Sequence, residues 1–347
     1  MDFLQTADLL YSQIAMTNVV KKMYEPDTFI RKTFFSSSRS TGTDVIAWDY
    51  VRGNKQLAQI TNPNAQARVM KRDGYKTHFI NSIHTKEKIL ATPNEAVNRL
   101  MGQNIFVTQG DAISKRIANI LNDDLKILTD RVIRRQEQLC AMAFTTGKIE
   151  VHSDDVDFTL DYQMPEGNKK VATTKWNSAT AEPLDDIQAL SNTIYIESGE
   201  QPNILLVGQD ACNELLKNKQ YMKYLDNRRV EFGEVRPEKR ESGVVYIGTL
   251  KLPKAFCDMY TYNAFYHNEN LEKVYYLDSK TIYMGSSTAL TEFAHTILTD
   301  ISTNPTDKIG AKRWITEDPS GMWLLVESAG IPVIYQPEAF GNMKVLD

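Results

Sequence analysis

The stretch Lys312-Arg313-Trp314-Ile315-Thr316-Glu317-Asp318-Pro319-Ser320-Gly321 leads into two short apolar segments at residues 323–326 and 331–335. Proline presets one backbone dihedral and glycine tolerates a positive one, so residues 317–321 predict a turn. The flanking residues are mostly β-branched or aromatic, which is typical of strands. We expect paired strands that complete a sheet, with Gln336-Pro337-Glu338 as the last turn. This pattern alone is equally compatible with an ordinary sheet edge.

Composition limits the class of protein. The chain has 347 residues, of which 42% are apolar and 24% charged, and this suits a folded protein of about two domains. No apolar run approaches the roughly 20 residues that cross a bilayer, and the first residues do not form a signal peptide. We therefore expect a soluble protein that is made in the cytoplasm and has no membrane partner.

The cysteines and the net charge exclude other classes. Cys140, Cys212 and Cys257 lie far apart without metal-like spacing, so we expect reduced, buried thiols. The formal net charge of -4 argues against a free-standing nucleic-acid binder, because such binding depends on cations placed against phosphates. Any contact with nucleic acid is expected to be weak or incidental.

Residues 1–44 have the composition of an arm. They begin with an amphipathic stretch and end in the polar run Ser36-Ser37-Ser38-Arg39-Ser40-Thr41-Gly42. Few apolar anchors follow the first turns, so we expect this segment to lie on something else rather than form its own core. Because the arm-like sequence starts at Met1, we expect that little of any leading segment has been removed.

Residues 45–90 alternate strand-like pieces with loop signals. Residues 45–51 favour a strand, and Asp73-Gly74 predicts a hairpin turn. A long two-stranded excursion is only marginally stable by itself, so we expect it to lie against a neighbouring subunit. A basic patch near an aromatic can bind nucleic acid, but a solvated or partner-facing hairpin tip is the simpler interpretation. The basic residues around the turn are Arg68, Lys71, Arg72 and Lys76.

Apolar residues recur at spacings of three and four from Ile113 to Met142 and predict a helix over residues 109–145. Thr108 and Asp111 resemble a capping box, and Gly147 is a plausible stop. At 1.5 Å per residue this helix would be on the order of 50 Å long, so we expect a strut under a sheet. Its other face carries the charged residues Lys115, Arg116, Asp123, Lys126, Asp130, Arg131, Arg134, Arg135 and Glu137.

Half-buried strands are predicted at residues 148–151 and 156–162 because polar and apolar residues alternate there. Four potential metal ligands lie near their junction: His152, Asp154, Asp155 and Asp157. Carboxylates often cluster in turns, the order does not match a calcium loop, and a single histidine adds little. We therefore expect no metal.

From Thr173 onward the pattern is α/β. Pro183, Asp185 and Asp186 favour a helix start, and residues 203–208 predict a buried strand. The dinucleotide-binding and P-loop glycine patterns are missing after it, so we expect a packed α/β unit and no cofactor. A helix is predicted next, and then further strands: residues 210–229, 244–248, 255–260 and 281–285.

Several short motifs accompany the long helix in a fixed order. They are Lys175-Trp176-Asn177, Pro183-x-Asp185-Asp186-Ile187, the strand at 203–207, Leu225-Asp226-x-Arg228-Arg229, Met284-Gly285, the tail at 314–319 and Pro337-Glu338-x-Phe340. Together they resemble the lambda-type major capsid proteins of tailed bacteriophages, the capsid protein E family. The resemblance covers nearly the whole chain from the hairpin onward. Each motif is weak alone, and their order and spacing make the resemblance specific.

The resemblance implies the α+β Hong Kong 97-type capsid fold. Residues 1–44 would be the N-terminal arm and 45–90 the extended loop. Residues 91–171 and 288–347 would form the peripheral domain with its spine helix, and 172–287 the axial domain. In such proteins the spine helix and its sheet bend when the shell expands.

The implied function is mechanical. Copies would assemble as hexamers and pentamers into an icosahedral virion shell around packaged double-stranded DNA, without sequence-specific binding. Assembly would occur in the host cytoplasm, with a scaffold protein, a portal and a decoration protein as candidate partners. We expect inter-subunit contacts at the loop residues Arg68, Lys71, Arg72 and Lys76, and at Arg228 and Arg229. For the last pair a salt bridge within the subunit is equally compatible with the sequence.

Two alternatives remain at this point. An encapsulin-like cellular nanocompartment has the same fold. A soluble α/β enzyme is the rival from another class, but no Gly-x-Ser-x-Gly or His-Glu-x-x-His pattern is present. The histidines also lack motif neighbours: His78, His84, His152, His267 and His295.

Overall fold

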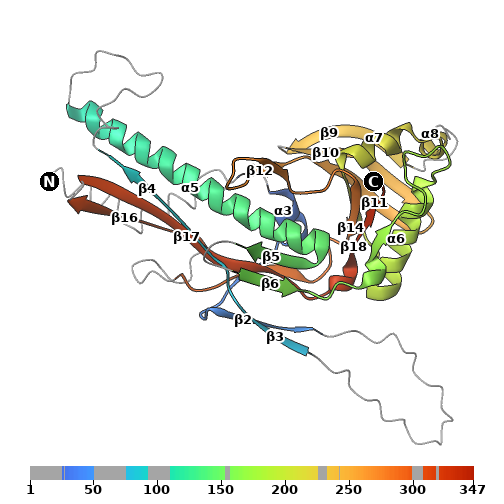
Figure 1. Ribbon diagram of the computed structural model, residues 1–347, viewed down its shortest axis with the longest axis horizontal. Helices are drawn as coiled ribbons and strands as arrows, with labels where there is room; N and C mark the ends of the chain where they lie inside the picture. Colours follow the sequence, from blue (N-terminus) through green and yellow to red (C-terminus); the bar gives the residue numbers. More distant parts are fainter. Residues whose placement is uncertain are drawn as a thin grey trace, which may run out of the picture.

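Two β-sheets and one long helix organise the molecule (Figure 1). The computed structural model describes residues 26, 28–50, 76–92, 110–152, 157–225, 233–241, 243–298, 308–317 and 320–347. The mixture of helices and strands confirms the predicted α+β class. Within these ranges, every helix is too short or too polar to span a bilayer.

Helix α5, Gly110–Thr146, confirms the predicted long helix to within one residue at each end. At 1.5 Å per residue its 37 residues extend for about 55 Å. Leu125, Leu128 and Val132 form an apolar stripe that packs on the first of the two sheets. Gly147 ends the helix with a φ of 69°, a conformation that glycine adopts without strain.

The first sheet lies along α5. Its strands follow the order β1-β15-β17-β16, and β4 also pairs with β17. Leu324 and Val326 of β17 and Ala311 of β16 contact the apolar stripe of the helix. Leu324 and Val326 are fully buried there, so the helix supports the sheet as predicted. The strands are β1 (Ser38–Ser40), β4 (His84–Ala91), β15 (Thr291–His295), β16 (Gly310–Glu317) and β17 (Ser320–Ile334).

Strand β17 corrects one sequence expectation. The two predicted apolar segments are parts of a single strand of 15 residues. Pairing explains its continuity, because β4 covers residues 322–329 and β15 takes over at residues 330–334. Gly330 permits this exchange of partners, since a Cβ there would lie 2.7 Å from the Ala294 carbonyl oxygen. The expected pairing of residues 312–317 with the following strand is confirmed.

The second sheet has seven strands in the order β7-β18-β14-β8-β11-β10-β9. The predicted last turn is the 3-10 helix η2 (Pro337–Ala339). After this turn the chain enters the second sheet, where β18 pairs with β7 and β14. The strands are β7 (Lys169–Val171), β8 (Ile204–Val207), β9 (Gly233–Glu241), β10 (Val244–Leu252), β11 (Ala255–Tyr262), β14 (Thr281–Gly285) and β18 (Phe340–Lys344).

Three helices pack with the seven-stranded sheet. Helix α6, Pro183–Ser198, starts at the predicted proline. The single helix predicted at 210–229 is instead two, α7 (Gln209–Lys217) and α8 (Lys219–Leu225). Asn218 separates them in an extended conformation, because its side-chain oxygen accepts the Gln220 N–H at 2.8 Å and starts the second helix.

Three antiparallel pairs of short strands complete the fold. The extended loop predicted at residues 45–90 contains the pair β2 (Val45–Tyr50) and β3 (Lys76–Asn81) and also most of β4. Its predicted turn at Asp73-Gly74 lies outside the described residues. Strands β5 (Lys148–His152) and β6 (Asp157–Asp161) match the predicted pair. The third pair, β12 (Phe265–His267) and β13 (Lys273–Tyr275), was not predicted.

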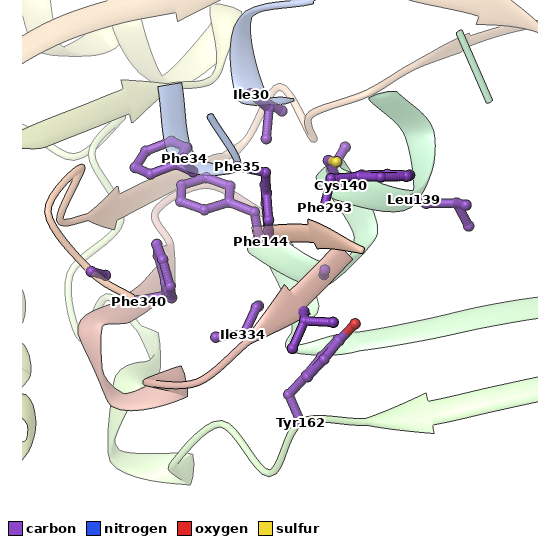
Figure 2. Packing of buried hydrophobic residues seen from close by; sticks show 14 of the residues in the cluster. Ile30, Phe34, Phe35, Leu139, Cys140, Phe144, Tyr162, Phe293, Ile334 and Phe340 are labelled. Carbon is purple, nitrogen blue, oxygen red and sulfur yellow. The ribbon is translucent and has the colours of Figure 1, made fainter. Parts of the chain in front are cut away.

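A buried aromatic cluster joins the N-terminal region to both sheets (Figure 2). The Phe34 and Phe144 rings stack with centroids 4.4 Å apart, and Phe340 meets Phe144 edge-on at 5.6 Å. Phe34 belongs to helix α3, Phe29–Phe34, inside the predicted arm. Part of the predicted arm is therefore packed into the core of its own chain.

Candidate assembly surfaces

Of the six contact residues predicted from the sequence, only Lys76 lies within the described residues. Arg68, Lys71 and Arg72 fall in residues 51–75, and Arg228 and Arg229 in residues 226–232, all outside the described residues. Lys76 is the first residue of β3, where only its backbone pairing with Tyr50 is described. Their role in contacts between subunits remains a prediction.

A buried carboxylate joins three parts of the chain. Glu137 of α5 accepts hydrogen bonds from the backbone N–H groups of Ile30 and Arg31, both at 3.0 Å. Its Oε1 also accepts the hydroxyl of Tyr262, at the end of β11, at 2.9 Å. This corrects the prediction that Glu137 belongs to the exposed charged face, since its exposed fraction is 1%. The carboxylate ties α3 to the long helix and to the seven-stranded sheet.

The electrostatics of this junction follow from burial. Burial raises the pKa of the Glu137 carboxyl, and the Arg31, Ile30 and Tyr262 donors oppose the rise. Burial also holds the pKa of the neighbouring Cys140 thiol well above its usual range. Cys140, Cys212 and Cys257 are all free and buried, as the sequence predicts. Such thiols are inert.

A second buried polar group lies on β15. His295 is fully buried, and neither ring nitrogen makes a well-formed hydrogen bond to any described residue. Burial lowers the pKa of His295 to about 3, and the positive charges of Arg31 and Lys308 contribute. The Ala329 carbonyl opposes this shift. The side chain is therefore held neutral in the folded chain.

His295 should make the subunit less stable in acid. An unfolded histidine titrates near pH 6.5 and the folded one near 3. The contribution of His295 to the free energy of unfolding is thus fully present above about pH 6.5. It decreases as the pH falls toward about 3, because the unfolded state binds a proton that the folded state does not. His295→Leu should flatten this slope, as measured by urea unfolding between about pH 7 and pH 4.5. Glu137 has a raised pKa and so favours the folded state in acid, but it does so equally in the wild type and in His295→Leu. An unchanged slope of stability against pH in His295→Leu would therefore contradict the assignment of the acid sensitivity to His295.

The hairpin of β12 and β13 presents an apolar outer face. Phe265 and Tyr275 pair across it, and the ammonium of Lys273 lies 4.2 Å and 4.5 Å from their ring centroids. The inner face is anchored, because the Tyr266 hydroxyl accepts a hydrogen bond from Gln138 of α5 at 2.9 Å. Figure 1 shows the hairpin beside α5. The hairpin therefore exposes aromatic side chains while its inner face is held by α5.

A basic surface with two apolar side chains lies on α7 and α8. Leu216 and Met222 are exposed there by 39% and 54%. Lys217, Lys219 and Lys223 of the same helices are exposed as well, and Lys217 pairs with Glu214 at 2.8 Å. The two helices therefore expose apolar and basic side chains together.

Two of the four potential metal ligands contact each other. His152 Nδ1 lies 2.7 Å from the Asp157 carboxylate, at the open end of the β5–β6 pair. Asp154 and Asp155 lie outside the described residues. In the part of the chain that the structure describes, there is no group of three or more side chains suited to a metal ion.

The chain matches the family model of phage major capsid protein E over residues 12–345. It is 22% identical over 329 residues to the major capsid protein of Enterobacteria phage P21, covering 90% of this chain and 92% of that protein. A prophage capsid protein from Escherichia coli CFT073 has the same fold, with a TM-score of 0.71 at 16% identity over 96% and 97% of the two chains. A phage-related protein from Bordetella bronchiseptica RB50 matches with a TM-score of 0.52 at 11% identity, over 96% of this chain and 97% of that chain.

These findings confirm the resemblance seen in the sequence and favour a phage capsid over the encapsulin-like alternative. Proteins of this kind assemble as oligomers into icosahedral heads. The chain belongs to the phage major capsid protein E family and is a structural protein of the phage head shell rather than an enzyme.

Proposed function

We propose that copies of this chain form hexamers and pentamers that close into an icosahedral head around double-stranded DNA. The family match over residues 12–345 carries this proposal. Closed shells are built from repeated contacts between identical subunits, so modest individual contacts suffice when many act together. Assembly takes place in the host cytoplasm, with a scaffold protein, a portal and a decoration protein as the partner classes.

The DNA is enclosed without sequence-specific binding. The net charge of -4 supports this, because a shell that bound phosphate groups strongly would need a large excess of cations. A weakly binding wall also leaves the packaged DNA free to enter and leave. We expect the contents of the head to be held by closure of the shell rather than by affinity.

The proposed role of each segment is the one expected from the sequence. Residues 1–44 act as an arm, 45–90 as an extended loop that contacts a neighbour, 91–171 with 288–347 as the peripheral domain and 172–287 as the axial domain. The pairing of β2 with β3 supports this assignment, because it brings the two described ends of the loop, Tyr50 and Lys76, side by side. The docking of α3 within the chain limits a freely extending arm to the residues that precede it.

Protection of nucleic acid tests the proposal. Particles purified from cells that produce the chain with the other head proteins of its phage should protect double-stranded DNA of mixed sequence from nuclease. Particles assembled without packaging partners should be empty. Particles from the same cells that instead hold a defined protein cargo and no DNA would contradict the proposal and favour an encapsulin-like compartment.

A further inference from the structure

The tip of the β12–β13 hairpin holds an exposed leucine in a strained conformation. Leu271 has a φ of 61° and an exposed fraction of 81%. A residue with a branched side chain adopts this region only at a cost in folding free energy, whereas glycine adopts it freely. Strain of this kind persists where the surrounding structure enforces it, and it clusters at functional sites.

Hydrogen bonds hold the backbone conformation of the tip. The Leu271 N–H donates to the Asn268 carbonyl at 2.9 Å, and the Asn268 N–H donates to the Glu272 carbonyl at 3.0 Å. The side chains repeat the link, since Asn268 Nδ2 donates to the Glu272 carboxylate and Asn268 Oδ1 accepts the Glu272 N–H, both at 2.8 Å. The leucine is therefore presented by a rigid turn.

The rest of the hairpin extends this surface. Phe265 and Tyr275 are exposed by 43% and 45%. On the inner face, the Tyr276 hydroxyl donates to the Arg134 carbonyl of α5 at 3.3 Å, so the hairpin is held in place on the long helix. Rigid aromatic and apolar side chains that are already in place lose little entropy on association and often dominate contact energies.

The surface on α7 and α8 is complementary to the tip. Leu271 is flanked by the exposed carboxylates of Glu269 and Glu272. On α8, the exposed Met222 lies between Lys219 and Lys223 in the sequence. The charges nearest Leu271 at the tip are thus negative, and those that flank Met222 on α8 are positive. Such complementarity selects partners and fixes their register.

We propose that the Leu271 tip docks on the α7–α8 surface of a second copy of this chain. Leu271 contacts Met222 and Leu216 there, and the acidic residues of the tip approach Lys219 and Lys223. In Figure 1 the hairpin and α8 lie well apart, so one copy cannot make this contact within itself. Two different surfaces that pair between copies form a head-to-tail contact, which closes into a ring when its rotation permits. The inference rests on the proposed function, because the rings are its hexamers and pentamers.

Replacing Leu271 with glycine separates folding from assembly. Leu271→Gly removes both the strained φ and the exposed side chain, so the midpoint of thermal unfolding should stay close to that of the wild type. The yield of rings and shells should fall by about tenfold or more under the same conditions. The matched control is Leu290→Ala, which removes another exposed apolar side chain and should assemble normally. Assembly of Leu271→Gly at the wild-type yield would overturn the inference.

A cross-link can detect the contact between Leu271 of one copy and Met222 of another even when no shell forms. The native cysteines are buried, so a double variant, Leu271→Cys with Met222→Cys, places the reactive thiols on the two surfaces. Under oxidation at high protein concentration, it should give a ladder of linked species beyond the dimer, which neither single variant gives. A missing ladder would overturn the contact. Absence of shells from the wild type with the ladder present would instead reject the proposed function.

Discussion

Glu137→Ala is expected to lower the free energy of unfolding of the subunit by roughly 3 kcal/mol or more, because a buried donor that loses its partner costs about 1–3 kcal/mol. The substitution leaves three donors without their acceptor: the N–H groups of Ile30 and Arg31 and the hydroxyl of Tyr262. The loss should be visible in urea unfolding. Proteolysis should also become faster around α3, because the carboxylate holds the start of that helix against α5.

Three further variants make this result specific. Glu137→Gln keeps the volume but has one oxygen for three donors, so its loss should be intermediate. Tyr262→Phe removes a single donor and should cost about 1 kcal/mol. Asp123→Asn changes an exposed carboxylate of the same helix and should stay within about 0.5 kcal/mol of the wild type. An effect of Glu137→Ala no larger than that of Asp123→Asn would contradict the assigned junction.

Gly208→Ala is expected to cost about 3 kcal/mol or to prevent soluble expression, through overpacking against fixed backbone. An added Cβ would lie 2.4 Å from the carbonyl oxygens of both Asp278 and Ser279. These atoms cannot rotate away as a side chain could. Gly208 is also fixed by its N–H, which donates to the Thr281 carbonyl at 3.0 Å, so the methyl group forces a strand or a loop to move.

Gly42→Ala is the matched control for this position. No atom lies within 4 Å of a Cβ added to Gly42, and the residue is exposed. We expect thermal unfolding of the Gly42 variant to coincide with that of the wild type. Equal behaviour of the two variants would mean that the close approach at the end of β8 is not rigid.

Local patterns predicted the elements whose partners lie nearby in sequence. The apolar spacing placed α5 within one residue, and alternation placed β5 and β6. Asn218 is a residue type that commonly starts a helix, but the surrounding apolar spacing concealed the break that it causes between α7 and α8. The hairpin of β12 and β13 also had a usable pattern, since aromatic strands flank the turn residues Asn268 and Asn270.

Properties that depend on distant partners could not be predicted. Glu137 lies beside Arg134 and Arg135, so its spacing suggests an exposed face. Its burial results from contacts with residues more than 100 positions away, and no local pattern indicates them. The continuity of β17 has the same origin, because β4 and β15 provide its hydrogen bonds. The proposed contacts at Arg68, Lys71, Arg72, Lys76, Arg228 and Arg229 stay predictions.

Electron microscopy of the purified chain, produced alone and together with its scaffold protein, tests most directly whether it builds a shell. We expect closed icosahedral particles, or tubes and separate rings of five and six subunits, in at least one of the two preparations. Sedimentation of the same samples measures the fraction that has assembled. A monodisperse monomer or dimer in both preparations would contradict the assignment as a head shell protein.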